Sequence, residues 1–166
     1  MKKLRDATLV FLIKGNPVDE ILLGLKKAGF AQGKLNGFGG KVENGETIER
    51  ATVRELKEET GVQVSEQDLR RMAHLTFAFP AKPEWDQVVH VFLARQWEGE
   101  PAESAEMRPA WYSVSEIPFE SMWQDDPHWL PLILRGKRIR ARFTFQADNE
   151  TVDQVEIKEC QSLEAV

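Results

Sequence analysis

The stretch GKVENGETIERATVRELKEETGV, residues 40–62, is the most informative part of the chain. It begins in a glycine-rich region, because six glycines lie between residues 29 and 45. Glycine and proline are then absent from Thr47 to Thr60, where glutamate and arginine predominate. Gly61 follows at the position that favours the end of a helix. The stretch therefore predicts a glycine loop followed by one helix over residues 47–60.

Several charged side chains of this helix fall on or near its apolar side. At about 100° per residue, that side contains Ile48, Ala51, Thr52 and Leu56. Glu55 and Glu59 lie in the same arc, Glu58 lies at its border and Arg54 lies just beyond. An unpaired carboxylate turned toward a core costs several kcal/mol, and like charges four residues apart repel. We therefore expect a positive group there; the alternative is an ordinary solvated charged face.

The spacing of the charged residues favours an acidic site that binds a positive group over an ordinary solvated face. From Gly40 the chain reads glycine, five residues, Glu46, seven residues, and then RELKEETGV. This is the pattern of the Nudix box without a departure, so the chain resembles the Nudix hydrolases. The resemblance implies one domain over residues 1–166, an α/β/α sandwich with a mixed β-sheet and a loop-helix-loop. It also implies hydrolysis of a nucleoside diphosphate linked to another group.

The acidic residues of the box suit a hard divalent cation. Mg²⁺ takes oxygen ligands and usually retains waters and substrate phosphate oxygens. We expect Mg²⁺, with Mn²⁺ as the alternative. The ligands implied by the resemblance are the Gly39 carbonyl, Glu55, Glu58, Glu59 and Glu106, although the default for Glu106 is a solvated loop. The catalytic residues are then Arg54, Glu55, Glu58 and Glu59, with Arg54 paired to Glu58 and the general base left open, Glu55 being preferred.

The sequence pattern of the rest of the chain predicts a strand-rich α/β protein. Apolar runs and period-two alternation predict strands over residues 7–13, 21–25, 75–79, 88–93 and 110–114, and a hairpin over 139–145 and 152–157. Short helices are expected around Phe119 and over residues 130–134. His74, His90 and His128 show no mutual metal-ligand spacing, so we expect structural roles for all three.

Composition narrows the class of protein. The chain has 166 residues and a net charge of −5, which argues against a nucleic-acid-coating or membrane-surface protein. The N-terminal apolar run lacks a cleavage site and is too short to cross a bilayer. Cys160 is the one cysteine, which fits a reducing compartment. We expect a cytoplasmic monomer that acts on a small nucleotide, with no stable nucleic-acid partner and no membrane.

Outside the box, the chain resembles the animal branch of the family that hydrolyses oxidised purine nucleoside triphosphates of the 8-oxo-dGTP type. The stretches that carry this likeness are residues 24–30, 35–45, 89–92, 106–111, 121–126 and 129–132. The resemblance implies that Asn36, Trp123, Asp125 and Asp126 read the base. The other substrate-binding residues that it implies are Thr8, Lys26, Phe30, Gly40 and Phe77.

A physical account of base recognition supports this assignment. A purine needs a flat apolar slot with a few donors and acceptors at its edge, and Trp123, Phe30, Phe77 and Trp129 offer ring surface. Two neighbouring aspartates in a poorly solvated pocket cannot easily both ionise, so one is expected to be protonated and to act as a donor. The alternatives are core packing for Trp123 and Phe77, and helix capping before Pro127 for the aspartates.

Three features depart from the pattern of that branch. Leu35 replaces a tryptophan beside Asn36, the loop 80–87 is slightly longer, and residues 137–142 are more basic. These departures predict a shifted preference among modified purines, such as 2-hydroxy- or N6-methyl-adenine nucleotides, with the same reaction. We expect water attack at the β-phosphorus, giving the monophosphate and pyrophosphate. The alternatives are a Nudix pyrophosphatase for ADP-ribose or a dinucleotide, and a non-catalytic nucleotide-sensing or RNA-binding module.

Overall fold

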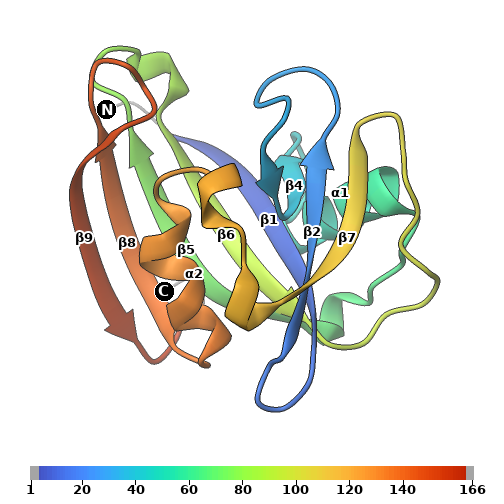
Figure 1. The fold of residues 1–166 in the computed structure, drawn as a ribbon. Coiled ribbons are helices and arrows are strands. Elements are labelled where there is room, and N and C mark those ends of the chain that lie inside the picture. Colours follow the sequence, from blue (N-terminus) through green and yellow to red (C-terminus); the bar gives the residue numbers. More distant parts are fainter. Residues whose placement is uncertain (1–3, 164–166) are drawn as a thin grey trace.

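The computed structural model in Figure 1 describes residues 4–163. Its strands are β1 (Arg5–Lys14), β2 (Glu20–Lys26), β3 (Leu35–Asn36), β4 (Phe38–Lys41), β5 (Leu69–Ala78), β6 (Gln87–Ala94), β7 (Met107–Ser113), β8 (Arg138–Phe145) and β9 (Val152–Cys160). Its two α-helices are α1 (Ile48–Thr60) and α2 (Asp126–Leu134). Short 3-10 turns cover Glu66–Asp68, Pro83–Trp85, Val114–Glu116 and Phe119–Ser121.

The strands form a mixed sheet in the order β3-β2-β1-β6-β5-β8-β9. The β1–β6 and β5–β8 pairs are parallel, and the other pairs are antiparallel. Strand β1 changes partner along its length, because Ala7–Val10 pairs with β4 whereas Ile13 and Lys14 pair with β2. Ala7, Thr8 and Leu9, in the part of β1 that pairs with β4, line the cavity described below.

The two α-helices lie on opposite faces of the sheet, as Figure 1 shows, with α2 over β8 and α1 against β1 and β4. Successive residues of β1 therefore enter different cores: Phe11 packs in the core on the α2 side and Val10 in the core on the α1 side. Because both faces of β1 are buried, its sequence is a continuous apolar run without alternation. This arrangement confirms the α/β/α sandwich with a mixed sheet.

Helix α1 has the ends that the sequence predicts. The Thr47 hydroxyl accepts a hydrogen bond from the Arg50 N–H at 3.1 Å, which satisfies one free donor of the first turn. Gly61 has φ +80°, and its N–H donates to the Lys57 carbonyl at 2.8 Å. The left-handed backbone at this position suits glycine and ends the helix.

Most predicted elements are present, with shifts at their ends. Strand β5 begins at Leu69, six residues before the expected position. The sequence pattern did not reveal its first part, because an irregularity between Arg71 and Ala73 interrupts the alternation there. Helix α2 begins before Pro127, which fits in its first turn. The β8–β9 hairpin is confirmed. In the described part of the chain, no helix is long and apolar enough to cross a membrane.

Candidate active site

The site begins at two glycines of β4 that allow close approach of neighbouring groups. A Cβ at Gly39 would collide with the backbone carbonyl of Thr8 on β1. A Cβ at Gly40 would lie 2.7 Å from the Glu55 carboxyl group. Both positions therefore require glycine: Gly39 lets β4 pair with β1, and Gly40 leaves space beside a helix carboxylate.

Glu59 turns inward from α1, as its helical position predicts. It is only 4% exposed, and its Oε1 accepts a hydrogen bond from the Gly39 N–H at 2.9 Å. Burial raises the pKa of Glu59 to about 8, and the nearby charges of Glu55 and Glu106 act in the same direction. The Gly39 N–H and Lys26 oppose this shift but do not cancel it. The carboxyl group therefore lacks a sufficient positive partner within the protein.

Arg54 joins the loop before α1 to the helix itself. Its Nε donates to Glu46 at 2.7 Å, its Nη1 to Glu55 at 2.9 Å, and its Nη2 to the Lys41 carbonyl at 3.1 Å. The predicted pair with Glu58 exists, but at 3.4 Å it is longer than these bonds. The Arg54 hydrogen bond lowers the pKa of Glu46 to about 2. Glu46 is thus the main partner of Arg54, in place of Glu58.

The remaining acidic residues differ in their surroundings. Glu55 is half-buried and its pKa is raised, because burial outweighs the hydrogen bond and charge of Arg54. Glu58 and Glu106 are exposed, and Glu106 lies 3.8 Å from the Lys26 Nζ. Within residues 4–163, no three acidic, histidine or cysteine side chains converge into a ready metal cluster. The acidic residues of the site nevertheless have the chemistry that a hard divalent cation prefers, since they offer carboxylate oxygens around Glu59, a buried acid that lacks a counter-charge.

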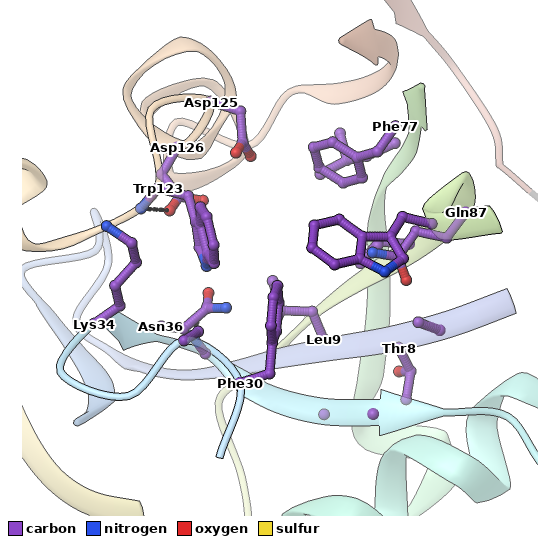
Figure 2. Close-up of a pocket in the computed structure, with 18 of the residues that line it drawn as sticks. Thr8, Leu9, Phe30, Lys34, Asn36, Phe77, Gln87, Trp123, Asp125 and Asp126 are labelled. Atoms are coloured by element: carbon purple, nitrogen blue, oxygen red, sulfur yellow. Dashed lines mark hydrogen bonds between the residues drawn. The ribbon is translucent and has the colours of Figure 1, made fainter. Parts of the chain in front are cut away.

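A cavity of about 500 Å³ extends from this acidic site to α2 (Figure 2). Most of the predicted site residues line it, although they come from strands and loops far apart in the sequence: Thr8, Lys26, Phe30, Asn36, Gly39, Gly40, Glu59, Phe77, Trp123, Asp125 and Asp126. Glu55 and Glu106 are not among the lining residues, but Glu55 lies beside Gly40 and Glu106 lies 3.8 Å from Lys26, both of which line the cavity. One cavity therefore contains the predicted base-reading residues and the innermost acid of the Nudix box.

The aspartate pair closes one end of the cavity. Asp125 and Asp126 are 5% and 2% exposed. The Trp129 indole N–H donates to Asp125 at 2.8 Å, and the Trp123 backbone N–H donates to Asp126 at 3.0 Å. Burial raises the pKa of Asp125 to about 6, and burial together with the Asp125 charge raises the pKa of Asp126 well above its usual value. These shifts favour retention of one proton by the pair at neutral pH.

The structure corrects the capping alternative for the aspartates and the expected role of Trp129. Asp125 occupies the residue before α2, but its side chain makes no capping hydrogen bond, so the capping interpretation of the pair is wrong. Trp129 is 1% exposed and packs 6.1 Å from Phe11 in the core. Its ring is therefore mainly a core group, and its contribution to the site is the N–H that holds Asp125.

The aromatic residues of the cavity divide between core and opening. Phe77 stacks on Phe143 at 5.7 Å, so the expected core packing applies to it, although one side of its ring lines the cavity. Trp123 contacts Phe30 at 5.8 Å with an interplanar angle of 23°, and the Lys34 Nζ lies 4.9 Å from the Trp123 ring. Trp123 is only partly buried and faces the cavity in Figure 2.

Thr8 and the histidines have mainly structural contacts. Thr8 is buried, and its hydroxyl hydrogen-bonds to that of Thr52, which ties β1 to α1. His90 forms a 2.9 Å contact from Nε2 to Asp6, and its ring lies 5.3 Å from that of His74. Neither histidine lines the cavity.

Sequence reasoning missed several cavity residues. These are Leu9, Lys34, Phe79, Trp85, Gln87, Val89 and Phe145. Leu9, Gln87, Val89 and Phe145 lie on β1, β6 and β8, and their positions follow from strand alternation once the inner face of each strand is known. Lys34 and Phe79 lie outside the strands, just before β3 and just after β5. Trp85 carries no such signal, because its place depends on how the loop between β5 and β6 folds over the sheet.

Comparison with known proteins identifies the family. The sequence profile of the NUDIX domain matches residues 3–133. The chain belongs to the Nudix family. This Nudix protein is 47% identical over 146 residues to the oxidized purine nucleoside triphosphate hydrolase of Danio rerio, which covers 88% of this chain and 90% of the relative. It is 43% identical over 162 residues to the protein of the same name from Mus musculus, covering 98% and 99%.

More distant relatives of this Nudix protein agree in fold. The 8-oxo-dGTP diphosphatase of Escherichia coli is 34% identical over 140 residues, covering 84% of this chain and all of the relative. The crystal structure of a MutT protein from Bacillus halodurans superposes with a TM-score of 0.79 at 24% identity, covering 93% of this chain and 97% of that one. Nudix hydrolases generally use divalent metal ions.

Proposed function

We propose that this protein hydrolyses oxidised or otherwise modified purine nucleoside triphosphates to the monophosphate and pyrophosphate, and so removes damaged nucleotides before they enter nucleic acid. The observation that carries the proposal is the single cavity that joins Asp125 and Asp126 to Gly39, Gly40 and Glu59. A nucleotide bound along it has its base at the aspartates and its phosphates at the acidic site. The names of the animal and bacterial relatives support the same substrate class.

The aspartate end suits modified purines because of its donors and acceptors. A protonated and an ionised carboxyl group side by side offer one donor and several acceptors. Asn36 adds amide donors, since its Oδ1 already accepts the Gly37 N–H at 2.9 Å. If the shared proton moves between the two aspartates, donor and acceptor exchange places. The site can then bind more than one tautomer or lesion of the purine edge.

At the acidic end, Glu55, Glu58, Glu59, Glu106 and the Gly39 carbonyl would hold the metal ion, which we propose to be Mg²⁺, with Mn²⁺ as a substitute. Mg²⁺ supplies charge screening for the phosphates and lowers the pKa of an attacking water. The Gly39 N–H orients Glu59 by its hydrogen bond. Lys26 places positive charge at the same end.

Glu55 is the group that we propose as proton acceptor for the attacking water. Its raised pKa suits a base near neutral pH, and Arg54 holds its carboxylate at 2.9 Å. Glu58 is more exposed and is held only by the longer contact to Arg54. We also propose that the protein acts on free nucleotides, since its net charge of −5 disfavours binding to nucleic acid. We propose further that it is a cytoplasmic monomer.

A substrate panel tests the proposal. Purified protein is assayed with 8-oxo-dGTP, 2-hydroxy-dATP, N6-methyl-dATP, dGTP, dATP, ADP-ribose and a dinucleotide, with Mg²⁺, Mn²⁺ or a chelator, and released pyrophosphate and phosphate are measured separately. We expect metal-dependent release of pyrophosphate, with the highest kcat/KM for a modified purine. Preference for ADP-ribose or a dinucleotide, or no metal-dependent turnover at all, would contradict the proposal.

A further inference from the structure

Trp85 lies at the cavity without belonging to either core. It ends the 3-10 turn Pro83–Trp85 in the loop between β5 and β6, and it lines the same cavity as Trp123 and the aspartate pair. Its ring contacts Phe30 edge to face, at 5.5 Å and 72°, and Phe79 at 5.8 Å and 86°. Trp85 thus brings a further indole to the cavity, from a loop that contains none of the predicted base-reading residues.

Phe30 connects Trp85 to Trp123. It is 68% exposed, more than any other large hydrophobic residue in the described chain, and it lies in the loop between β2 and β3. Its ring contacts Trp123 at 5.8 Å and Trp85 at 5.5 Å. A single exposed phenylalanine needs no explanation. Three rings from three separate segments, in contact at the edge of one cavity, form a surface suited to a flat ligand.

The loop that carries Trp85 is fixed by several hydrogen bonds. The Asp86 carboxylate accepts the Phe79 N–H at 2.7 Å, which closes the base of the loop. Arg5 donates to the Glu84 carbonyl at 2.7 Å, and the Trp85 N–H donates to the Lys82 carbonyl at 2.9 Å. Trp85 is therefore positioned before any ligand binds, which reduces the entropy lost on binding.

One part of the Trp85 ring is already occupied. The Lys82 Nζ lies 4.0 Å from the ring centroid, as in a cation-π contact. Phe30 and Phe79 meet the ring edge to face. Gln87, two residues further along, lies across the open centre of the cavity from Trp123 in Figure 2, so the chain after Trp85 forms the wall that faces Trp123.

We propose that Trp85 is a specificity-determining residue that closes the side of the base cavity opposite Trp123, with Phe30 in contact with both indoles, and that it holds a purine by ring contact. The proposal rests on the proposed function only in that the ligand is a purine nucleotide. It predicts that Trp85 acts on affinity for the base and leaves the phosphate chemistry unchanged. The loop 80–87, whose length departs from the family pattern, would then be the segment that sets this chain's preference among purines.

The test compares W85L and W85F with W97L. Trp97 is a matched control, because it is also a partly buried tryptophan in ring contact, with Trp111 at 5.8 Å, and it does not line the cavity. Calorimetry gives the Kd for 8-oxo-dGMP, dGMP and dAMP without metal, steady-state kinetics gives KM and kcat, and inhibition by tripolyphosphate reports the phosphate end. Thermal unfolding confirms that each variant is folded.

We expect W85L to raise the Kd for the best-bound monophosphate, and KM for its triphosphate, by roughly ten-fold or more, the scale of one lost base–aromatic stack. The kcat and the inhibition by tripolyphosphate should stay within about three-fold, W85F should recover most of the affinity, and W97L should match the wild type. Unchanged Kd values in W85L, or a fall in kcat alone, would overturn the role of Trp85. A wild type that binds purine monophosphates but lacks preference for modified triphosphates would instead contradict the proposed function and leave this test intact.

Discussion

Glu59 is the buried carboxyl group of the acidic site, and the positive groups of the protein do not offset its desolvation. Glu59→Gln keeps an oxygen that can accept the Gly39 N–H and removes the negative charge that would bind a cation. We expect kcat with Mg²⁺ to fall by orders of magnitude. Because the buried charge costs energy in the native state, the melting temperature should stay level or rise. Glu66→Gln, an exposed change in the turn after α1, is the control. Near-normal turnover in Glu59→Gln would refute the metal-binding assignment.

The aspartate pair should govern which base is accepted. Asp125→Asn or Asp126→Asn replaces one carboxyl group by an amide and removes the movable proton. We expect the ratio of kcat/KM between modified and unmodified purine triphosphates to change by about ten-fold or more. The exposed Asp153→Asn on β9 should leave this ratio unchanged. Equal ratios in all the variants would remove the pair from base recognition.

At the scale of elements, the two glycines of β4 should fail in different ways. Gly39→Ala places a methyl group against the Thr8 carbonyl, which breaks the β1–β4 pairing, so the unfolding midpoint in urea should drop strongly. Gly40→Ala meets only a carboxyl group at 2.7 Å, a side chain that can move aside. It should stay folded and lose most of its activity. The reverse pattern in denaturation and kinetic measurements would contradict this account.

The elements that sequence predicted best carry their own boundary signals. Helix α1 begins and ends at Thr47 and Gly61, where a capping hydroxyl and a left-handed glycine are local necessities. The β8–β9 hairpin shows alternation along β8, because only one of that strand's faces is buried. The inward turn of Glu59 follows from helical periodicity alone. These features needed no knowledge of the rest of the molecule.

Other elements depend on distant contacts and could not be predicted. Strands β3 and β4 consist of six residues, two of them glycine, and exist because β1 and β2 accept them as partners. The choice of Glu46 as the main partner of Arg54 depends on the path of the loop. The position of Trp85 depends on the packing of its loop against the one that carries Phe30.

For the whole molecule, the raised pKa of Asp125 predicts a pH effect on stability. Its carboxyl group has a pKa near 6 when folded and near 3.8 when unfolded, so between these values the native state binds more protons. The free energy of unfolding should therefore fall as the pH rises from about 4 to 6. We expect this loss to be about 1–3 kcal/mol larger in the wild type than in Asp125→Asn. Urea denaturation at intervals from pH 4 to 7 measures the difference, and parallel curves would contradict the shift.

The comparison also cancels the opposite effect of Glu46, whose lowered pKa adds stability that is lost as the pH falls through about 4 to 2.

Strand β1 supplies residues alternately to the two cores, with Val10 on one side and Phe11 on the other. Insertion of a single residue in it would exchange the two sets along the part of the strand that shifts. The loops that carry Phe30 and Trp85 are free of this constraint, because they can lengthen or shorten without reversing a strand. Divergence among descendants of this chain should therefore change substrate preference through those two loops, while the strands of the sheet keep their register.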